Sequence, residues 1–126
     1  NSNTNCNYSL SQLLLYLDPN CDHCEDMLLE IVKIKNNNLI ELPEVHIIFG
    51  NNYAEETKTY INDLFTRVGQ KFNYTIVSNE DWNKLFFAEY DTPGMKYIFN
   101  GNQLLFFEGV GVNKFNKNKL MEKLLK

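Results

Sequence analysis

The sequence predicts an α/β fold in three layers, α/β/α, with a central mixed sheet and a C-terminal β-hairpin followed by a helix. Segments with the apolar pattern of strands alternate with segments of helical spacing through most of the chain. Such alternation implies parallel strands, right-handed crossovers and helices on both faces of the sheet. Asn100-Gly101 then separates two further apolar runs, and Asn-Gly is the strongest short-range signal for a hairpin.

The first strand is predicted at the apolar run of residues 13–17, which Asp18-Pro19 closes. A short run without alternation is typical of a strand buried on both faces near the middle of a sheet. Pro19 cannot continue the ladder of such a strand. A helix is predicted next, from Cys21 to residues 36–38. The apolar residues on one face of this helix are Met27, Leu28, Ile31 and Val32.

The middle of the chain is predicted to hold a second strand at residues 45–49 and a helix over residues 53–68, ended by Gly69. A third strand is expected at residues 74–77. The residues that share the buried face of the helix are expected to be Thr57, Tyr60, Ile61, Leu64, Phe65 and Val68.

The last third of the chain is predicted to begin with a short helix through Phe86, capped by Ser78 or Asn79. The two hairpin strands and the closing helix are expected at residues 96–99, 104–108 and 117–125. The closing helix is expected to place on one face Leu120, Met121, Leu124 and Leu125. The aromatic residues expected in the core are Trp82, Phe86, Phe87, Phe99, Phe106 and Phe107. His46 lies inside an apolar strand and is expected to be a core or edge residue rather than a metal ligand.

Length and composition predict one domain and limit the classes of function. The 126 residues are expected to divide into a flexible leader, 1–9, and one domain, 10–126. The net charge is −4 and the basic residues are scattered, which argues against a nucleic-acid partner. The longest apolar run is far short of the roughly 18 residues that a membrane span requires. No segment near Asn1 has the pattern of a signal peptide.

The chemistry is expected at Cys21 and Cys24, two of the three cysteines. Residues spaced i and i+3 at a helix start face the same way, so their sulfurs can reach the ~2 Å of a disulfide. The free N–H groups and the dipole of the helix start favour a thiolate at Cys21, which makes it the nucleophile. Cys24, one turn further in, is placed to resolve a mixed disulfide. Two alternatives are an inert buried pair and half of a zinc site, completed from Cys6, His23 and His46.

The chain resembles the thioredoxin superfamily, and within it the extracytoplasmic TlpA and ResA reductases. The resemblance rests on a strand that leads into the pair Cys21 and Cys24, on Thr92-Pro93, and on Asn100-Gly101 with Gly109 at the familiar spacings. It implies a cis bond before Pro93, placed beside the cysteines. It also implies that the Thr92 backbone can pair with an extended substrate strand.

The resemblance further implies a protein thiol–disulfide oxidoreductase without a cofactor or metal. Its partners would be protein thiols or disulfides and a redox donor, and the chain is expected to be a monomer. The expected location is periplasmic or otherwise extracytoplasmic, with any signal or anchor absent from this chain. Cys6, in the leader, is expected to take no part in the redox cycle.

His23 is expected to modulate the site, because it precedes the second cysteine as a histidine does in DsbA. An imidazolium stabilises a nearby thiolate and makes the disulfide more oxidising, although a solvated residue without this role is the alternative. Asp22, Glu25 and Asp26 oppose the effect by like charge. Their main role is expected to be stabilisation of the helix start.

Two positions depart from thioredoxin itself. Leu15 stands where thioredoxin has a buried carboxylate, and Asn20 stands where it has tryptophan. Both suggest an exchange that is slower or differently tuned.

A non-catalytic thioredoxin-fold binding module is the alternative function. A thiol peroxidase is disfavoured, because Asp18 replaces the Thr or Ser expected three residues before the cysteine. A glutaredoxin is disfavoured because no Gly-Gly pair follows Thr92-Pro93.

Overall fold

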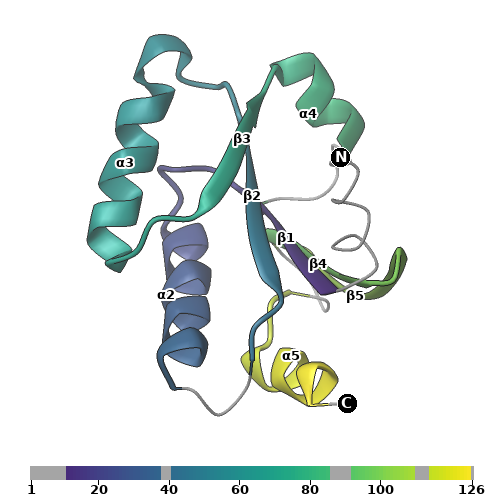
Figure 1. Ribbon diagram of the computed structural model, residues 1–126. Helices are drawn as coiled ribbons and strands as arrows, with labels where there is room; N and C mark the ends of the chain where they lie inside the picture. Colours follow the sequence, from purple (N-terminus) through teal and green to yellow (C-terminus); the bar gives the residue numbers. More distant parts are fainter. Residues whose placement is uncertain (1–10, 38–40, 86–91, 110–113, 126) are drawn as a thin grey trace, which may run out of the picture.

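The fold is known from a computed structural model, which describes residues 11–37, 41–85, 92–109 and 114–125. In these residues, five strands form one mixed sheet in the order β3-β2-β1-β4-β5 (Figure 1). β1 pairs in parallel with β2 and antiparallel with β4, so it lies at the centre as predicted. The strands are β1 (Ser11–Leu17), β2 (Glu44–Gly50), β3 (Asn73–Val77), β4 (Gly94–Phe99) and β5 (Asn102–Phe107).

Helices cover both faces of the sheet and complete the predicted α/β/α layers. Two crossovers in the same direction, β1 to β2 and β2 to β3, place α2 and α3 together on one face (Figure 1). The ion pair of Lys117 with Glu30, 3.4 Å, joins α5 to α2 on that face. α4 lies on the other face, where Trp82 contacts Tyr16. None of the described helices is both long and apolar enough to cross a membrane. The helices are α2 (Asp22–Asn37), α3 (Thr57–Val68), α4 (Asn79–Leu85) and α5 (Lys117–Leu124), with a 3₁₀ turn η1 at Ala54–Glu56.

The main core lies between the sheet and the layer of α2, α3 and α5. Alternate residues of β1 point into it, and the antiparallel register of β4 adds residues from the same face. Leu120 anchors α5 in this core and is fully buried. Fully buried members from the sheet and from α2 and α3 are Leu13, Leu15, Leu17, Leu28, Ile31, Ile47, Phe49, Ile61, Leu64 and Met95.

The opposite face of β1 carries Tyr16, which is also buried, as expected for a strand covered on both sides. Trp82 from α4 packs edge-on against Tyr16, with the ring centroids 6.3 Å apart. A Cβ on Gly50 would lie 3.3 Å from the Trp82 ring, so the missing side chain at Gly50 allows α4 to approach the sheet. Ser78 caps α4, because its hydroxyl accepts the Asp81 N–H at 3.1 Å.

The hairpin is confirmed and its turn has the geometry that Asn-Gly favours. Asn100 and Gly101 both have positive φ, 53° and 81°, as a type I′ turn requires. The predicted helix over residues 53–68 differs in detail. Its first turn is the 3₁₀ turn η1, and α3 begins only at Thr57, whose hydroxyl accepts the Tyr53 N–H.

Some expectations about burial are wrong. Phe99 is 43% exposed at the end of β4, where it pairs with Asn102 of the edge strand β5. Leu125 is 69% exposed, because it follows the last residue of α5. Phe107 is buried as expected, while Trp82 and Phe106 are half-buried.

The remaining expectations concern His46 and residues outside the described part of the chain. His46 is a half-buried strand residue whose Nε2 lies 2.8 Å from the Thr75 hydroxyl on the neighbouring strand. Phe86, Phe87, Cys6 and the leader 1–9 lie outside the described residues.

Candidate functional site

Cys21 is the residue immediately before α2, at the carboxyl end of the central strand. Its carbonyl accepts the first helical hydrogen bond, from the Glu25 N–H at 3.1 Å. Its sulfur accepts the Cys24 N–H at 3.2 Å. Ser and Thr cap helices in this way with a hydroxyl oxygen, so Cys21 is an N-cap whose acceptor is a sulfur. The cap places a half-buried thiol where helix N–H groups favour negative charge.

Cys24 lies in the first turn of α2 and points into the core. It is fully buried, and its sulfur accepts the Asp18 N–H at 3.4 Å. Both cysteines are free thiols in this structure. Cys21 is therefore the more accessible of the two sulfurs.

The pKa values of the two thiols are shifted in opposite directions. The hydrogen bond from the Cys24 side chain, with smaller contributions from backbone N–H groups and from Thr92, lowers the pKa of Cys21 to about 6 despite its partial burial. Burial, together with the hydrogen bond to Cys21, raises the pKa of Cys24 far above its usual range. At neutral pH the pair therefore holds a Cys21 thiolate and a Cys24 thiol.

Thr92 and Pro93, which immediately precede β4, lie beside the two cysteines. The peptide bond between them is cis, as the resemblance to thioredoxins implies, and Pro93 is buried. The Thr92 side chain lowers the pKa of both cysteines, so it lies near the two sulfurs. A groove of about 760 Å³ adjoins the site, and its lining includes His23, Met27, Thr92, Pro93, Gly109 and Phe115.

His23 is exposed in the first turn of α2. The contribution of this residue that lowers the pKa of Cys21 comes from its backbone N–H. Any effect of the imidazole on the thiolate stays a prediction.

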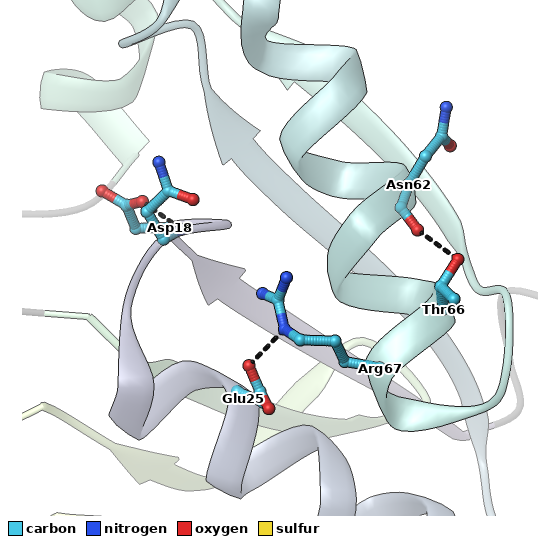
Figure 2. Close-up of polar contacts among 6 residues, drawn as sticks. Asp18, Glu25, Asn62, Thr66 and Arg67 are labelled. Carbon is cyan, nitrogen blue, oxygen red and sulfur yellow. Dashed lines mark hydrogen bonds and ion pairs between the residues drawn. The ribbon is translucent and has the colours of Figure 1, made fainter.

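Of the three acidic residues at the start of α2, Glu25 forms an ion pair. The Arg67 guanidinium, at the end of α3, binds Glu25 with an Nε–Oε1 distance of 2.8 Å (Figure 2). Cys21, Glu25 and Arg67 line the same small hollow beside the site. Asp22 and Asp26 are exposed. One of the three nearby carboxylates thus has its charge balanced by α3.

Sequence reasoning missed the role of Asp18 as a hydrogen-bonding centre. Its carboxylate accepts the Asn20 N–H at 2.8 Å and the Tyr53 hydroxyl at 2.9 and 3.2 Å. The Asn20 contact is an Asx-turn, which an aspartate two residues earlier could have suggested. The Tyr53 contact joins residues 35 positions apart, and no local pattern predicts it.

The two positions that depart from thioredoxin differ in burial. Leu15 is fully buried in the core, so an apolar side chain fills the position of the thioredoxin carboxylate. Asn20 is exposed. Among the described residues, no three His, Cys, Asp or Glu side chains group as a metal site would require.

Solved structures share this architecture over almost the whole chain. A secreted Mycobacterium tuberculosis disulfide oxidoreductase homologous to E. coli DsbE superposes with a TM-score of 0.69, covering 93% of this chain and 81% of that one at 9% identity. StoA from Bacillus subtilis has a TM-score of 0.65, covering 90% and 81% at 12% identity. The thioredoxin domain of a Bacteroides vulgatus thiol-disulfide oxidoreductase has a TM-score of 0.66, covering 95% and 83% at 11% identity. The chain has a thioredoxin-like fold.

The sequence of this thioredoxin-like chain also has a curated relative. It is 38% identical over 104 residues to Protein TlpB from Flavobacterium psychrophilum, covering 82% of this chain and 27% of the relative. The chain therefore spans about a quarter of the length of that relative. No family model matches the chain. The likenesses in sequence and in structure agree with the resemblance to TlpA-related oxidoreductases.

Proposed function

We propose that this chain is a thiol–disulfide oxidoreductase that exchanges disulfides with protein substrates through Cys21 and Cys24. The observation that carries the proposal is the pairing of two unlike thiols at one helix start. Cys21 is half-exposed with its pKa lowered to about 6, and the pKa of the buried Cys24 is raised. A dithiol in which only the accessible sulfur is ionised at neutral pH is suited to attack a substrate disulfide.

In the reductive direction the Cys21 thiolate attacks one sulfur of a substrate disulfide. A Cys21–substrate bond forms, and the other substrate cysteine leaves as a thiolate that takes up a proton. Cys24 then loses its proton and attacks Cys21. The Cys21–Cys24 disulfide forms, and the second substrate cysteine leaves. The reverse sequence oxidises a substrate dithiol, and an external redox partner returns the pair to its starting state.

Thr92 and Pro93 are the proposed substrate-binding residues. They line the groove that adjoins the site, and in this proposal the Thr92 backbone pairs with an extended substrate strand. His23 lines the same groove and is the proposed modulator. We also propose that the chain is a monomer and acts in an extracytoplasmic compartment. One protein of similar structure is described as secreted.

Insulin reduction with dithiothreitol as donor tests the function. The wild-type chain is expected to accelerate precipitation of the insulin B chain, and Cys21→Ser is expected to abolish the acceleration. Cys24→Ser is expected to accumulate a mixed disulfide with insulin, visible as a larger species on non-reducing gels. Cys6→Ser is the matched control and is expected to match the wild type.

A wild-type chain without activity, whose Cys24→Ser variant traps no mixed disulfide, would contradict the proposal. It would favour the alternative of a non-catalytic binding module.

A further inference from the structure

The turn between β1 and α2 is organised around Asp18, one residue before Pro19. Its carboxylate accepts the Asn20 N–H at 2.8 Å, and its carbonyl accepts the Cys21 N–H at 3.2 Å. Figure 2 shows Asp18 at this turn, above the start of α2. The side chain and the main chain of Asp18 therefore stabilise the turn that leads from β1 to the cysteines.

The N–H group of Asp18 acts on the second cysteine. It donates to the Cys24 sulfur at 3.4 Å and lowers the pKa of that thiol against the larger effect of burial. A buried thiolate needs such a donor, because few other polar groups reach it. Cys24 must become a thiolate at the moment when it resolves a mixed disulfide.

Tyr53, which is half-buried, fixes the far side of the carboxylate. Its hydroxyl donates to both Asp18 oxygens, at 2.9 and 3.2 Å. Burial, and then the hydrogen bond to Asp18, raises the pKa of Tyr53, so the hydroxyl stays protonated and remains a donor. The ring packs edge-on against Tyr60, with the centroids 5.0 Å apart.

The backbone around Tyr53 is held as firmly as its ring. The Tyr53 N–H donates to the Thr57 hydroxyl at 3.2 Å, and that hydroxyl donates to the Asn51 side chain at 3.0 Å. The next residue, Ala54, has φ of 52°, a left-handed conformation that is costly for a residue with a Cβ. Such local strain persists only where the surrounding contacts maintain it. These contacts therefore fix the position of Tyr53, and with it the hydroxyl that binds Asp18.

We propose that Asp18 is a positioning residue for the resolving step, with Tyr53 as its clamp: the carboxylate, held by the Tyr53 hydroxyl and the Asn20 amide, aims the Asp18 N–H at the Cys24 sulfur. The proposal rests on the proposed function. In the step concerned, the Cys24 sulfur gives up its proton and attacks the Cys21 sulfur of the mixed disulfide. The Cys21–Cys24 bond forms, the substrate cysteine leaves as a thiolate, and that thiolate takes up a proton from water. Asp18 transfers no proton in this scheme, because its amide is the group that contacts sulfur.

The test follows both steps with 5,5′-dithiobis(2-nitrobenzoate) as the disulfide, in a Cys6→Ser background so that two thiols remain. Attack by Cys21 releases one thionitrobenzoate, and attack by Cys24 on the mixed disulfide releases the second. Each release is seen as absorbance in stopped flow. Asp18→Ala removes the acceptor, Asp18→Asn keeps an oxygen for Asn20 and Tyr53, and Tyr53→Phe removes the clamp hydroxyl. Tyr60→Phe is the matched control.

Asp18→Ala is expected to slow the second release about three- to tenfold, the effect of one hydrogen bond, and to leave the first release unchanged. Tyr53→Phe is expected to slow the second release by a smaller factor. Asp18→Asn and Tyr60→Phe are expected to react like the parent. Circular dichroism checks that each variant is folded, and Tyr53→Phe keeps the test decisive if Asp18→Ala does not fold.

Three results would overturn the proposal alone: an unchanged second release in Asp18→Ala, an unchanged one in Tyr53→Phe, or an Asp18→Asn variant as slow as Asp18→Ala. The last would mean that the charge acts and not the orientation. A parent protein that releases no second thionitrobenzoate would overturn the proposed function, and this proposal with it.

Discussion

Cys21 combines two roles at a single residue, because the sulfur that caps α2 is also the proposed nucleophile. The Cys24 N–H that completes the cap is one of the groups that lower the pKa of Cys21. A thiolate is a better acceptor for that N–H than a thiol, so folding of the helix start and ionisation of Cys21 support each other.

The ionisation of Cys21 predicts how labelling depends on pH. Because the folded protein lowers the pKa of Cys21 to about 6, the thiolate is the major form above that pH and is lost below it. The rate of alkylation by iodoacetamide is expected to rise with a midpoint near pH 6. Peptide mapping of a Cys6→Ser variant should find the label on Cys21, with Cys24 protected by burial and by its raised pKa. Earlier labelling of Cys24 would contradict the assignment of nucleophile and resolving cysteine.

His23 offers a second prediction at this scale, because its N–H and its imidazole can be removed separately. His23→Pro removes both groups and is tolerated in a first helical turn. His23→Gln removes only the imidazole. Both variants are expected to make the Cys21–Cys24 couple more reducing, and the proline variant more so, since the N–H lowers the pKa of Cys21. A tenfold change in equilibrium constant corresponds to about 30 mV, which titration against glutathione resolves. A shift toward a more oxidising potential in either variant would show that this view of His23 is wrong.

At the scale of elements, α2 and α3 meet at the ion pair of Glu25 with Arg67 beside the site. Both side chains are partly exposed, so the pair is expected to contribute little to stability, about 0–1 kcal/mol. Its larger effect is expected to be on charge, because without Arg67 the Glu25 carboxylate would stand unopposed near Cys21.

A double-mutant cycle tests this effect of α3. Arg67→Gln is expected to raise the pKa of Cys21, because an uncompensated carboxylate disfavours a nearby thiolate. Adding Glu25→Gln is expected to reverse most of that rise. The pKa is read from the ultraviolet absorbance of the thiolate as a function of pH. Lys84→Gln, in the remote pair with Glu80 on α4, is the control. An Arg67→Gln variant with the parental pKa would exclude the electrostatic role.

At the scale of the whole molecule, the sheet and three helices on one face share a single core that supports the site. Leu120 is the buried contact of α5 with this core. Leu120→Ala is expected to destabilise the folded state by about 2–5 kcal/mol through lost burial and the cavity left behind. Urea unfolding followed by circular dichroism measures the change. Leu125→Ala, at an exposed position of the same segment, should lie within about 0.5 kcal/mol of the parent. Equal effects of the two substitutions would contradict the docking of α5 through Leu120.

Local patterns along the sequence were enough to predict the order of the elements, the central strand, the hairpin and the pair of cysteines. Each of these depends on neighbours in the chain: an apolar run before Pro19, helical spacing after Cys21, and Asn-Gly with its tolerance of positive φ. The cis bond before Pro93 was also expected, but only through resemblance to a family.

The tertiary structure decided what depends on residues distant in sequence. Phe99, at the end of β4, is exposed, and no pattern within the strand carries that information. The contacts of Tyr53 with Asp18 and of Arg67 with Glu25 join segments 35 and 42 residues apart. Hydrophobic periodicity reports which face of an element is buried, whereas a polar contact depends on which side chains the packed layers bring within about 3 Å. For this reason the cysteines could be read from the sequence, while the contacts that Asp18 and Arg67 make beside them could be read only from the fold.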